Sequence, residues 1–238
     1  MGNSNTRQHL ETAQKTGACQ LCKLNLKEVP EDLQRLKNSL RTLDLSFNKI
    51  PELPPWIVQF TSLKNLSVSH NKITSLPVDI GNLKKLEVLN ADHNLLTSVP
   101  RSIANITNLK TLNLSGNRLH AFPLELCNLR NLDVVDLSSN AIMELPGNIG
   151  GLQAVELNLN QNQVSRLPES LADCPRLKVL RLEENCLDVT AFTPRIMRDS
   201  QISLFAVEGN VFDMKTFHNV EGYEAYMERF TATKKKFN

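Results

Sequence analysis

The sequence predicts an α/β solenoid, in which short units stack so that a parallel sheet lines the concave face and short helices or 3₁₀ turns line the convex face. Three observations predict it: an asparagine recurs every 22–25 residues, leucines alternate just before it, and a Leu-Pro pair usually follows it. Eight such units at a nearly constant period are typical of a repeat protein, since one unit cannot bury its own leucines and needs its neighbours.

The repeat becomes clear when the chain is aligned on its recurring asparagine. Apolar residues precede it by 8, 5 and 3 positions, as Leu40, Leu43 and Leu45 precede Asn48. Further apolar residues follow it by 2 and 5 positions, usually with a proline next. The asparagines of this expected structural ladder are Asn48, Asn71, Asn94, Asn117, Asn140, Asn162, Asn185 and Asn210.

Each segment of the unit has its own physical reason. The Leu-x-Leu alternation indicates a short strand with two leucines on one side. The asparagine comes where the chain turns out of the strand, and its side-chain amide can pair with backbone groups that no sheet neighbour reaches. The Leu-Pro half carries apolar residues at helical spacing, and proline starts a short helical or 3₁₀ segment.

Two units depart from the pattern. Residues 151–159 lack one residue, so Ala154 or Val155 must fill a leucine position. The unit between Asn185 and Asn210 is longer and has no Leu-Pro pair, and we expect a longer convex helix there.

The chain is expected to fall into three segments. Residues 1–15 form a leader and an N-terminal cap, with a short helix around residues 5–15. Residues 16–212 hold eight or nine repeats, beginning with an incomplete one. Residues 213–238 form a cap helix, over residues 213–230, and a basic tail, because stacked repeats need their open ends covered.

Composition and charge exclude several classes of function. Lysine and arginine number 27 against 25 aspartate and glutamate residues, a net charge of +2 that gives no argument for nucleic acid. Aromatic residues make up only 5%, so a base-stacking surface is not expected. No apolar stretch is long enough to span a membrane, and the N-terminus has no apolar segment typical of a secretion signal. The five cysteines are therefore expected to be free thiols.

The N-terminus carries a lipidation motif. Residues 1–6, MGNSNT, fit the pattern M-G-x-x-x-[ST], which predicts N-myristoylation of Gly2 once Met1 is removed. One myristoyl chain gives only marginal membrane binding, so a second signal would normally be needed. Lys234 and the two lysines after it are a candidate, with a solvated tail as the alternative, and palmitoylation of Cys19 or Cys22 is another. Otherwise the anchor is reversible or a partner supplies the second contact.

The concave face is the predicted partner-binding surface. Residues between the inward leucines point outward, and they include an exposed aromatic residue, two histidines and an acidic end. The alternative is that Phe47 folds against its own turn and that the histidines are ordinary surface. The candidate residues are Asp44, Phe47, His70, Asn90, Asp92, His93, Asn113, Asp136, Arg181 and Glu183.

The sequence predicts no enzyme, no metal site, no cofactor and no small-molecule substrate. His70 and His93 can come close to each other near Asp92, but a metal site would need at least one more convergent ligand and supporting contacts. Cys19 and Cys22 form a CxxC pair without a second pair and outside a redox context, so they are expected to pack as structural residues. Catalytic motifs with a phosphate loop, a serine elbow or a zinc helix are absent.

The LPxxIxxL unit resembles the cytosolic class of leucine-rich repeats shared by Ras-pathway scaffolds such as the Ras suppressor proteins. The resemblance covers roughly residues 16–212. It implies a leucine-rich repeat horseshoe without established enzyme activity, whose concave face binds other proteins.

Together these observations predict a lipid-anchored, monomeric adaptor that binds one protein partner at the cytoplasmic face of a membrane, with a cytosolic pool. Two alternatives stay open. One is a regulator of a Ras-like GTPase or phosphatase complex, by analogy with the repeat class alone. The other is a soluble repeat scaffold without an anchor.

Overall fold

The computed structural model describes the backbone of residues 3–234 and the side chains from residue 7 onward. Two compact units divide the chain between Arg118 and Leu119. Gly2 and the lysines at 235 and 236 lie outside the described residues. Among the helices of the described part, none is both long enough and apolar enough to cross a bilayer.

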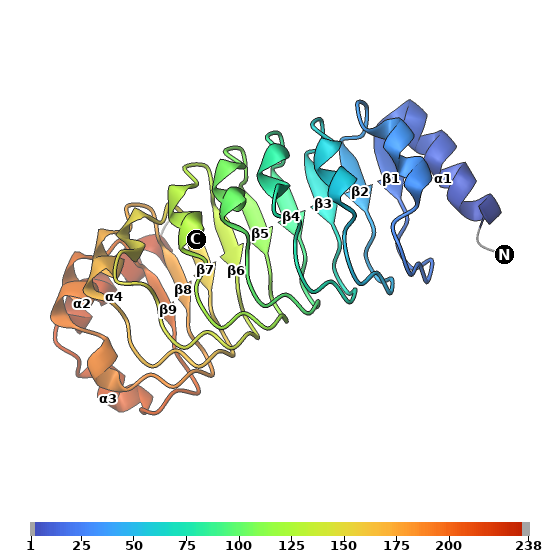
Figure 1. Ribbon diagram of the computed structural model, residues 1–238. Coiled ribbons are helices and arrows are strands. Elements are labelled where there is room, and N and C mark those ends of the chain that lie inside the picture. Colours follow the sequence, from blue (N-terminus) through green and yellow to red (C-terminus); the bar gives the residue numbers. More distant parts are fainter. Residues whose placement is uncertain (1–2, 235–238) are drawn as a thin grey trace. The chain divides into compact units, whose positions relative to one another are not determined.

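The first unit begins with a helix that packs beside the first of five parallel strands (Figure 1). Neighbouring strands pair in chain order, and each pairs its three residues with the equivalent three of the next repeat. Short 3₁₀ helices occupy the return half of the repeats, after the Leu-Pro pair where the sequence has one. The elements are α1 (Asn3–Thr16), β1 (Ala18–Gln20), β2 (Thr42–Asp44), β3 (Asn65–Ser67), β4 (Val88–Asn90) and β5 (Thr111–Asn113), with 3₁₀ helices η1 (Glu31–Leu36), η2 (Pro55–Gln59), η3 (Ile80–Asn82) and η4 (Arg101–Asn105).

The second unit continues the same pattern and ends in helices. Its four strands are also parallel and paired in chain order. The elements are β6 (Val134–Asp136), β7 (Glu156–Asn158), β8 (Val179–Arg181) and β9 (Leu204–Ala206), with η5 (Leu124–Asn128), η6 (Ile149–Gly151), η7 (Glu169–Asp173), η8 (Val189–Ala191), α2 (Pro194–Asp199), α3 (Met214–His218) and α4 (Tyr223–Lys234). The predicted solenoid of parallel strands and short 3₁₀ turns is therefore confirmed.

Three local expectations can be compared with the structure. Ala154 fills the leucine position of the shortened repeat, because it is fully buried whereas Val155 is not. The longer repeat does form a helix, α2. The single cap helix over residues 213–230 is wrong: α3 and α4 are separated by a turn at Gly222, whose φ of 90° no helix continues.

The core is a column of aliphatic side chains inside each unit. The central residue of every strand points inward and is buried, while its two neighbours face outward. In the first unit these central residues are Cys19, Leu43, Leu66, Leu89 and Leu112. Within each unit, the outward sides of the strands form a surface, which we call the strand face of that unit.

The recurring asparagines tie each turn to the repeat before it. The Nδ2 of Asn94 donates to the backbone carbonyls of Val68 and Ala91, and its Oδ1 accepts from the backbone N–H of Ile73. This side chain thus replaces the backbone partners that the turn cannot supply. Every ladder asparagine accepts a backbone N–H of the preceding repeat in the same way: Asn48, Asn71, Asn94, Asn117, Asn140, Asn162, Asn185 and Asn210.

The last strand is covered by the C-terminal helices. The ring of Phe205 in β9 packs against Phe192, Phe217 and Tyr226 at centroid distances of 5.2–6.5 Å. The backbone N–H of Phe205 donates to the Tyr226 hydroxyl, and the guanidinium of Arg229 donates to three backbone carbonyls before β9. The edge of the sheet is therefore closed by side chains of α4.

Candidate binding surface on the strand face

One residue per repeat adopts a left-handed backbone just before the ladder position, and we call these residues the left-handed column. Their φ angles lie between 50° and 76°. The turn is held by a backbone N–H that donates to the next repeat, as His70 does to Asp92. The column consists of Lys23, Phe47, His70, His93 and Gly116 in the first unit and Ser139, Gln161, Glu184 and Gly209 in the second.

In the first unit the column carries a stack of rings, formed by Phe47, His70 and His93. The Phe47 and His70 centroids are 4.3 Å apart with planes 13° apart, and the His70 and His93 centroids are 4.2 Å apart with planes 14° apart. Adjacent parallel strands are spaced by about 4.8 Å, so equivalent side chains at this turn meet face to face. We call this group the ring stack.

Both ends of the ring stack are defined by its neighbours in the column. The Lys23 ammonium lies 5.3 Å from the centroid of the Phe47 ring, within the range of a cation–π contact. At the other end, a Cβ on Gly116 would lie 3.1 Å from the His93 ring. Glycine therefore gives that ring room to lie flat against the next turn.

An acidic side chain links the two histidines. Asp92 Oδ2 lies 3.0 Å from His93 Nδ1 and 3.7 Å from His70 Nε2. Ser69 Oγ donates to the other oxygen of the same carboxylate. The Asp92 side chain is only 14% exposed, whereas those of His70 and His93 are 38% and 57% exposed. Both histidine side chains are therefore partly exposed beside a carboxylate that is nearly buried.

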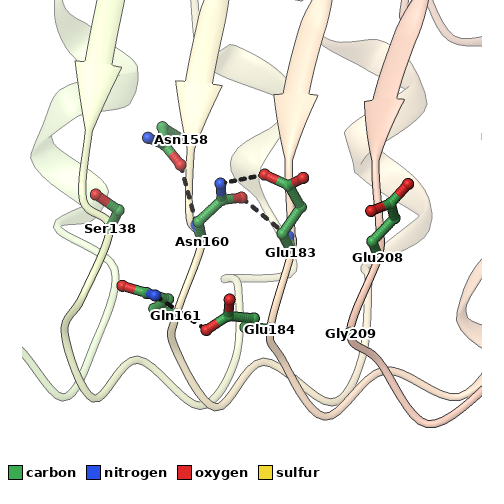
Figure 2. A pocket seen from close by; sticks show the side chains of 8 residues that line it. All are labelled: Ser138, Asn158, Asn160, Gln161, Glu183, Glu184, Glu208 and Gly209. Carbon is green, nitrogen blue, oxygen red and sulfur yellow. Dashed lines mark hydrogen bonds between the residues drawn. The ribbon is translucent and has the colours of Figure 1, made fainter.

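In the second unit the strand face holds a polar pocket of about 500 Å³, which we call the acidic pocket (Figure 2). Asn160 Nδ2 donates to the Glu183 carboxylate at 2.6 Å, and Gln161 Nε2 donates to Glu184 at 2.9 Å. Glu208 adds a third carboxylate, and the Glu156 carboxylate is paired with Arg181 at 2.8 Å beside it. The lining residues are Ser138, Asn158, Asn160, Gln161, Glu183, Glu184, Glu208 and Gly209.

Several candidate residues from the sequence serve the turns. Asp44, Asn113 and Asp136 each accept a hydrogen bond from the backbone N–H two residues later, which closes an Asx turn. Asn90 lies at the end of β4, half-buried on the strand face. The side chains of Asp44, Asn113 and Asp136 therefore shape the turns, a role that the sequence analysis did not assign to them.

The remaining candidates form two groups. The structure brings together Phe47, His70, Asp92 and His93 in the first unit. It places Arg181 and Glu183 on and just after β8 in the second. Phe47 does not fold against its own turn, because the residue is 50% exposed and its ring stacks on His70 of the next repeat.

Sequence reasoning missed Lys23, Ser69 and Gly116 as neighbours of the ring stack. The signal for Gly116 was its position directly before Asn117, and the signal for Lys23 was its position directly before Leu24, which takes the asparagine position of the incomplete first repeat. Ser69 has the weaker signal of lying one repeat before Asp92, at the equivalent position.

The cysteines offer no activated thiol among the buried positions. Burial raises the pKa of Cys19 to about 11 and that of Cys174 to about 12, so both stay protonated. Cys19 lies inside β1 and is fully buried, and all five cysteines are free. The first cysteine of the CxxC pair therefore packs in the core.

Comparison with known proteins agrees with this geometry. The family described as "Leucine rich repeat" matches residues 38–96 and 61–119, and the one described as "Leucine Rich repeats (2 copies)" matches residues 107–150. The matched ranges contain strands from both units.

Solved structures show the same fold. A leucine-rich repeat protein of Leptospira interrogans is 25% identical, with a TM-score of 0.59 over 86% of this chain and 63% of its own. The ectodomain of the Arabidopsis thaliana receptor kinase GASSHO1/SCHENGEN3, in complex with Casparian strip integrity factor 2, is 28% identical, with a TM-score of 0.65 over 81% of this chain and 25% of its own. An internalin of Listeria monocytogenes, 22% identical over 78% of this chain and 51% of its own, shares the fold with a TM-score of 0.60. The chain thus spans between a quarter and two thirds of the length of these structures.

Proposed function

We propose that this chain, which is a leucine-rich repeat protein, acts as a non-enzymatic adaptor that binds a protein partner through its strand face and is anchored by a lipid at the cytosolic side of a membrane. The single observation that carries partner binding is the ring stack. An exposed phenylalanine ring stacked on two histidines, with lysine and aspartate beside it, combines an apolar anchor with polar surroundings. Such aromatic anchors dominate the free energy of many protein interfaces.

The repeat architecture supports the same proposal. The Arabidopsis receptor ectodomain, at 28% identity, is described in complex with Casparian strip integrity factor 2. By analogy, we propose that the strand face of this chain receives a protein segment that contacts the ring stack. The acidic pocket, with three carboxylates among its lining residues, favours a partner that also carries basic side chains.

The test of the binding surface is a matched pair of variants used as bait in cells. Phe47→Ala combined with His93→Ala removes both outer rings of the stack, and we expect it to lose at least one partner that the wild-type chain captures. Val78→Ala is the control, because it truncates a 76% exposed apolar side chain of the same unit that is outside the ring stack. Retention of every partner by the double variant would show that the ring stack is not the binding surface.

The same experiment separates the alternative function. Partners that are captured only when a small GTPase is loaded with GTP would favour a regulator of a Ras-like complex. Capture that is independent of nucleotide supports the adaptor.

The lipid anchor rests on the sequence motif at Gly2. Acylation requires an N-terminal glycine, because the enzyme uses the amine of an unsubstituted residue. One myristoyl chain binds membranes with a constant of only about 10⁴ M⁻¹, so we propose that the protein partner supplies the second contact.

The anchor is tested by the mass of the N-terminal peptide from protein made in eukaryotic cells. We expect a peptide that lacks Met1 and carries a C14 acyl group, and we expect Gly2→Ala to lack the acyl group and to leave the membrane fraction. An unmodified or acetylated N-terminus in the wild type would leave a soluble scaffold. That outcome would not affect the test of the ring stack.

A further inference from the structure

We propose that His70, Asp92 and His93 form a binding site for a zinc ion on the strand face of the first unit. Each of the three offers one ligand atom, and these atoms all lie within 4.8 Å of one another. They come from two successive turns of the solenoid, and the left-handed backbone at both histidines directs their side chains to the same side.

Two of the three distances between the ligand atoms are close to those in a zinc site. Ligand atoms at about 2.0–2.1 Å from a tetrahedral zinc ion are about 3.3 Å apart. Asp92 Oδ2 is 3.0 Å from His93 Nδ1 and 3.7 Å from His70 Nε2, so the two observed distances lie on either side of that value. Movements of well under an ångström would give the required separation in these two pairs, whereas the third pair, the ligand nitrogens of His70 and His93, is known only to lie within 4.8 Å and needs a larger rearrangement.

The ligand types favour zinc over magnesium and calcium. Two imidazoles and one carboxylate suit zinc and its transition-metal neighbours, whereas magnesium and calcium prefer oxygen ligands alone. We expect a water molecule to complete the four ligands, because the side chains of His70 and His93 are partly exposed to solvent. The site needs a fourth ligand besides the three side chains, and this water supplies it.

Supporting contacts hold the carboxylate in place. Ser69 Oγ donates to Asp92 Oδ1, so that Oδ2 is the oxygen directed at the histidines. The backbone carbonyl of Asp92 accepts the N–H of His70 at 2.9 Å, which fixes the two turns relative to each other. Such contacts around a metal ligand commonly change metal affinity by about 10–100-fold.

Zinc binding must open the ring stack. A metal ion lies in the plane of the imidazole that binds it, and the planes of His70 and His93 are now nearly parallel, 14° apart. At least one ring must therefore rotate about its Cβ–Cγ bond to bring both nitrogens to one ion. We expect this rotation to uncover the face of His70 or of Phe47, which links zinc to the shape of the surface.

The experiment is a titration of zinc chloride into the full chain, free of affinity tags, with a chromophoric chelator as competitor. We expect one zinc ion per chain with the wild type. His70→Asn and His93→Asn should each weaken zinc binding by more than tenfold, and Ser69→Ala by about tenfold. Asparagine is the replacement because it tolerates the positive φ of these two positions. His120→Asn, at an exposed histidine outside the cluster, is the matched control and should bind zinc as the wild type does.

Histidine NMR signals give a second measurement that does not depend on the variants. Zinc should shift the imidazole resonances of His70 and His93 and leave that of His120 in place. The proposal is overturned if the wild type binds no zinc, if the His70→Asn, His93→Asn double variant keeps wild-type affinity, or if the NMR shifts occur at other histidines only.

Discussion

At the scale of single residues, buried asparagines hold the turns of both units. Asn94 is buried and makes four backbone hydrogen bonds, to Val68, Ala91, Asp92 and Ile73. A buried backbone group that loses its partner costs about 1–3 kcal/mol. Replacing the side-chain amide of a ladder asparagine should therefore lower the free energy of unfolding considerably.

We therefore expect Asn94→Ala to lower the free energy of unfolding by about 1–3 kcal/mol, since it leaves the buried Ile73 N–H unpaired. It also removes one of the two asparagine donors from each of the carbonyls of Val68 and Ala91, which keep Asn71 and Asn117. Chemical denaturation measures this loss. Asn108→Ala is the control, because its exposed side chain makes one bond, to Lys84, and should cost about 1 kcal/mol or less. Equal losses for the two variants would contradict a structural role for the ladder.

The ring stack shows which features of single residues the sequence can predict and which it cannot. The repeat placed Phe47, His70 and His93 in one column, so a surface group was predictable. Their positive φ was not, because it depends on hydrogen bonds to the next repeat, such as that from Phe47 to Ser69. Face-to-face stacking and the contact with Lys23 follow from that backbone conformation, and no composition or spacing indicates it.

At the scale of elements, the 3₁₀ helices pack so closely that one glycine decides their approach. A Cβ on Gly81, in η3, would lie 2.1 Å from the backbone oxygen of Ser102 in η4 and 2.9 Å from the Cβ of Asn105. A backbone atom cannot move aside as a flexible side chain can. The distance between these two helices therefore requires glycine at this position.

Gly81→Ala is expected to lower the free energy of unfolding by about 1–3 kcal/mol, because the added methyl group forces η3 away from η4. Thermal unfolding followed by circular dichroism measures the change. Gly147→Ala is the matched control: it has open space around its Cβ, and its effect should stay within about 0.5 kcal/mol. A Gly81→Ala variant as stable as wild type would show that η3 and η4 can separate without cost.

Charged residues before the strands also couple neighbouring elements. Glu87, which precedes β4, lies 2.8 Å from the Lys110 ammonium and 3.0 Å from that of Lys64. Hydrogen bonds from Lys110 and then from Lys64 lower the pKa of the Glu87 carboxyl from 4.5 to about 2. A carboxyl with a lowered pKa stabilises the folded state at pH values above its ordinary pKa.

The contribution of Glu87 should therefore be fully present above about pH 4.5 and disappear as the pH falls toward 2. An NMR titration of its side-chain carbon should give a midpoint well below that of an ordinary glutamate. The double variant Lys64→Met, Lys110→Met should raise this midpoint toward 4.5. A wild-type midpoint already near 4.5 would show that the lysines do not hold the carboxylate in solution.

The cap helices mark the limit of sequence reasoning for elements. Apolar spacing in residues 213–230 predicted one helix, whereas Gly222 breaks it. A Cβ on Gly222 would lie 2.9 Å from side-chain atoms of Met197 and Arg198 in α2. The turn is thus fitted to residues more than twenty positions earlier, and local periodicity carries no information about that contact.

At the scale of the whole molecule, repetition made the architecture predictable. Each repeat contacts mainly its neighbours, so a period visible in the sequence fixes the strands, their order and their register. The ends are the exception, since a terminal repeat has no neighbour on one side. There the chain uses α1 against β1 and the C-terminal helices against β9.

A chain that ends at residue 212 should lose stability and self-associate. It removes α3 and α4, which leaves the Phe205 N–H unpaired and exposes the rings of Phe192 and Phe205 at an open sheet edge. The melting temperature and the mass in solution measure both effects. A chain that ends at residue 234 is the control, because it keeps every cap contact described above. A monomeric, equally stable chain of 212 residues would show that the last repeat needs no cap.

In the left-handed column, the side chains that vary at the surface are separate from the side chains that form the ladder and the core. The ladder and the core specify the fold together with the backbone of the column, while the column's side chains, present at every position except Gly116 and Gly209, are outside the ladder and the core. The residue types in the column are restricted, because positive φ disfavours β-branched side chains. The nine residues include no valine, isoleucine or threonine. Within that restriction, substitutions in the column can change the surface one repeat at a time. New binding specificity can therefore evolve while the ladder and core residues stay the same.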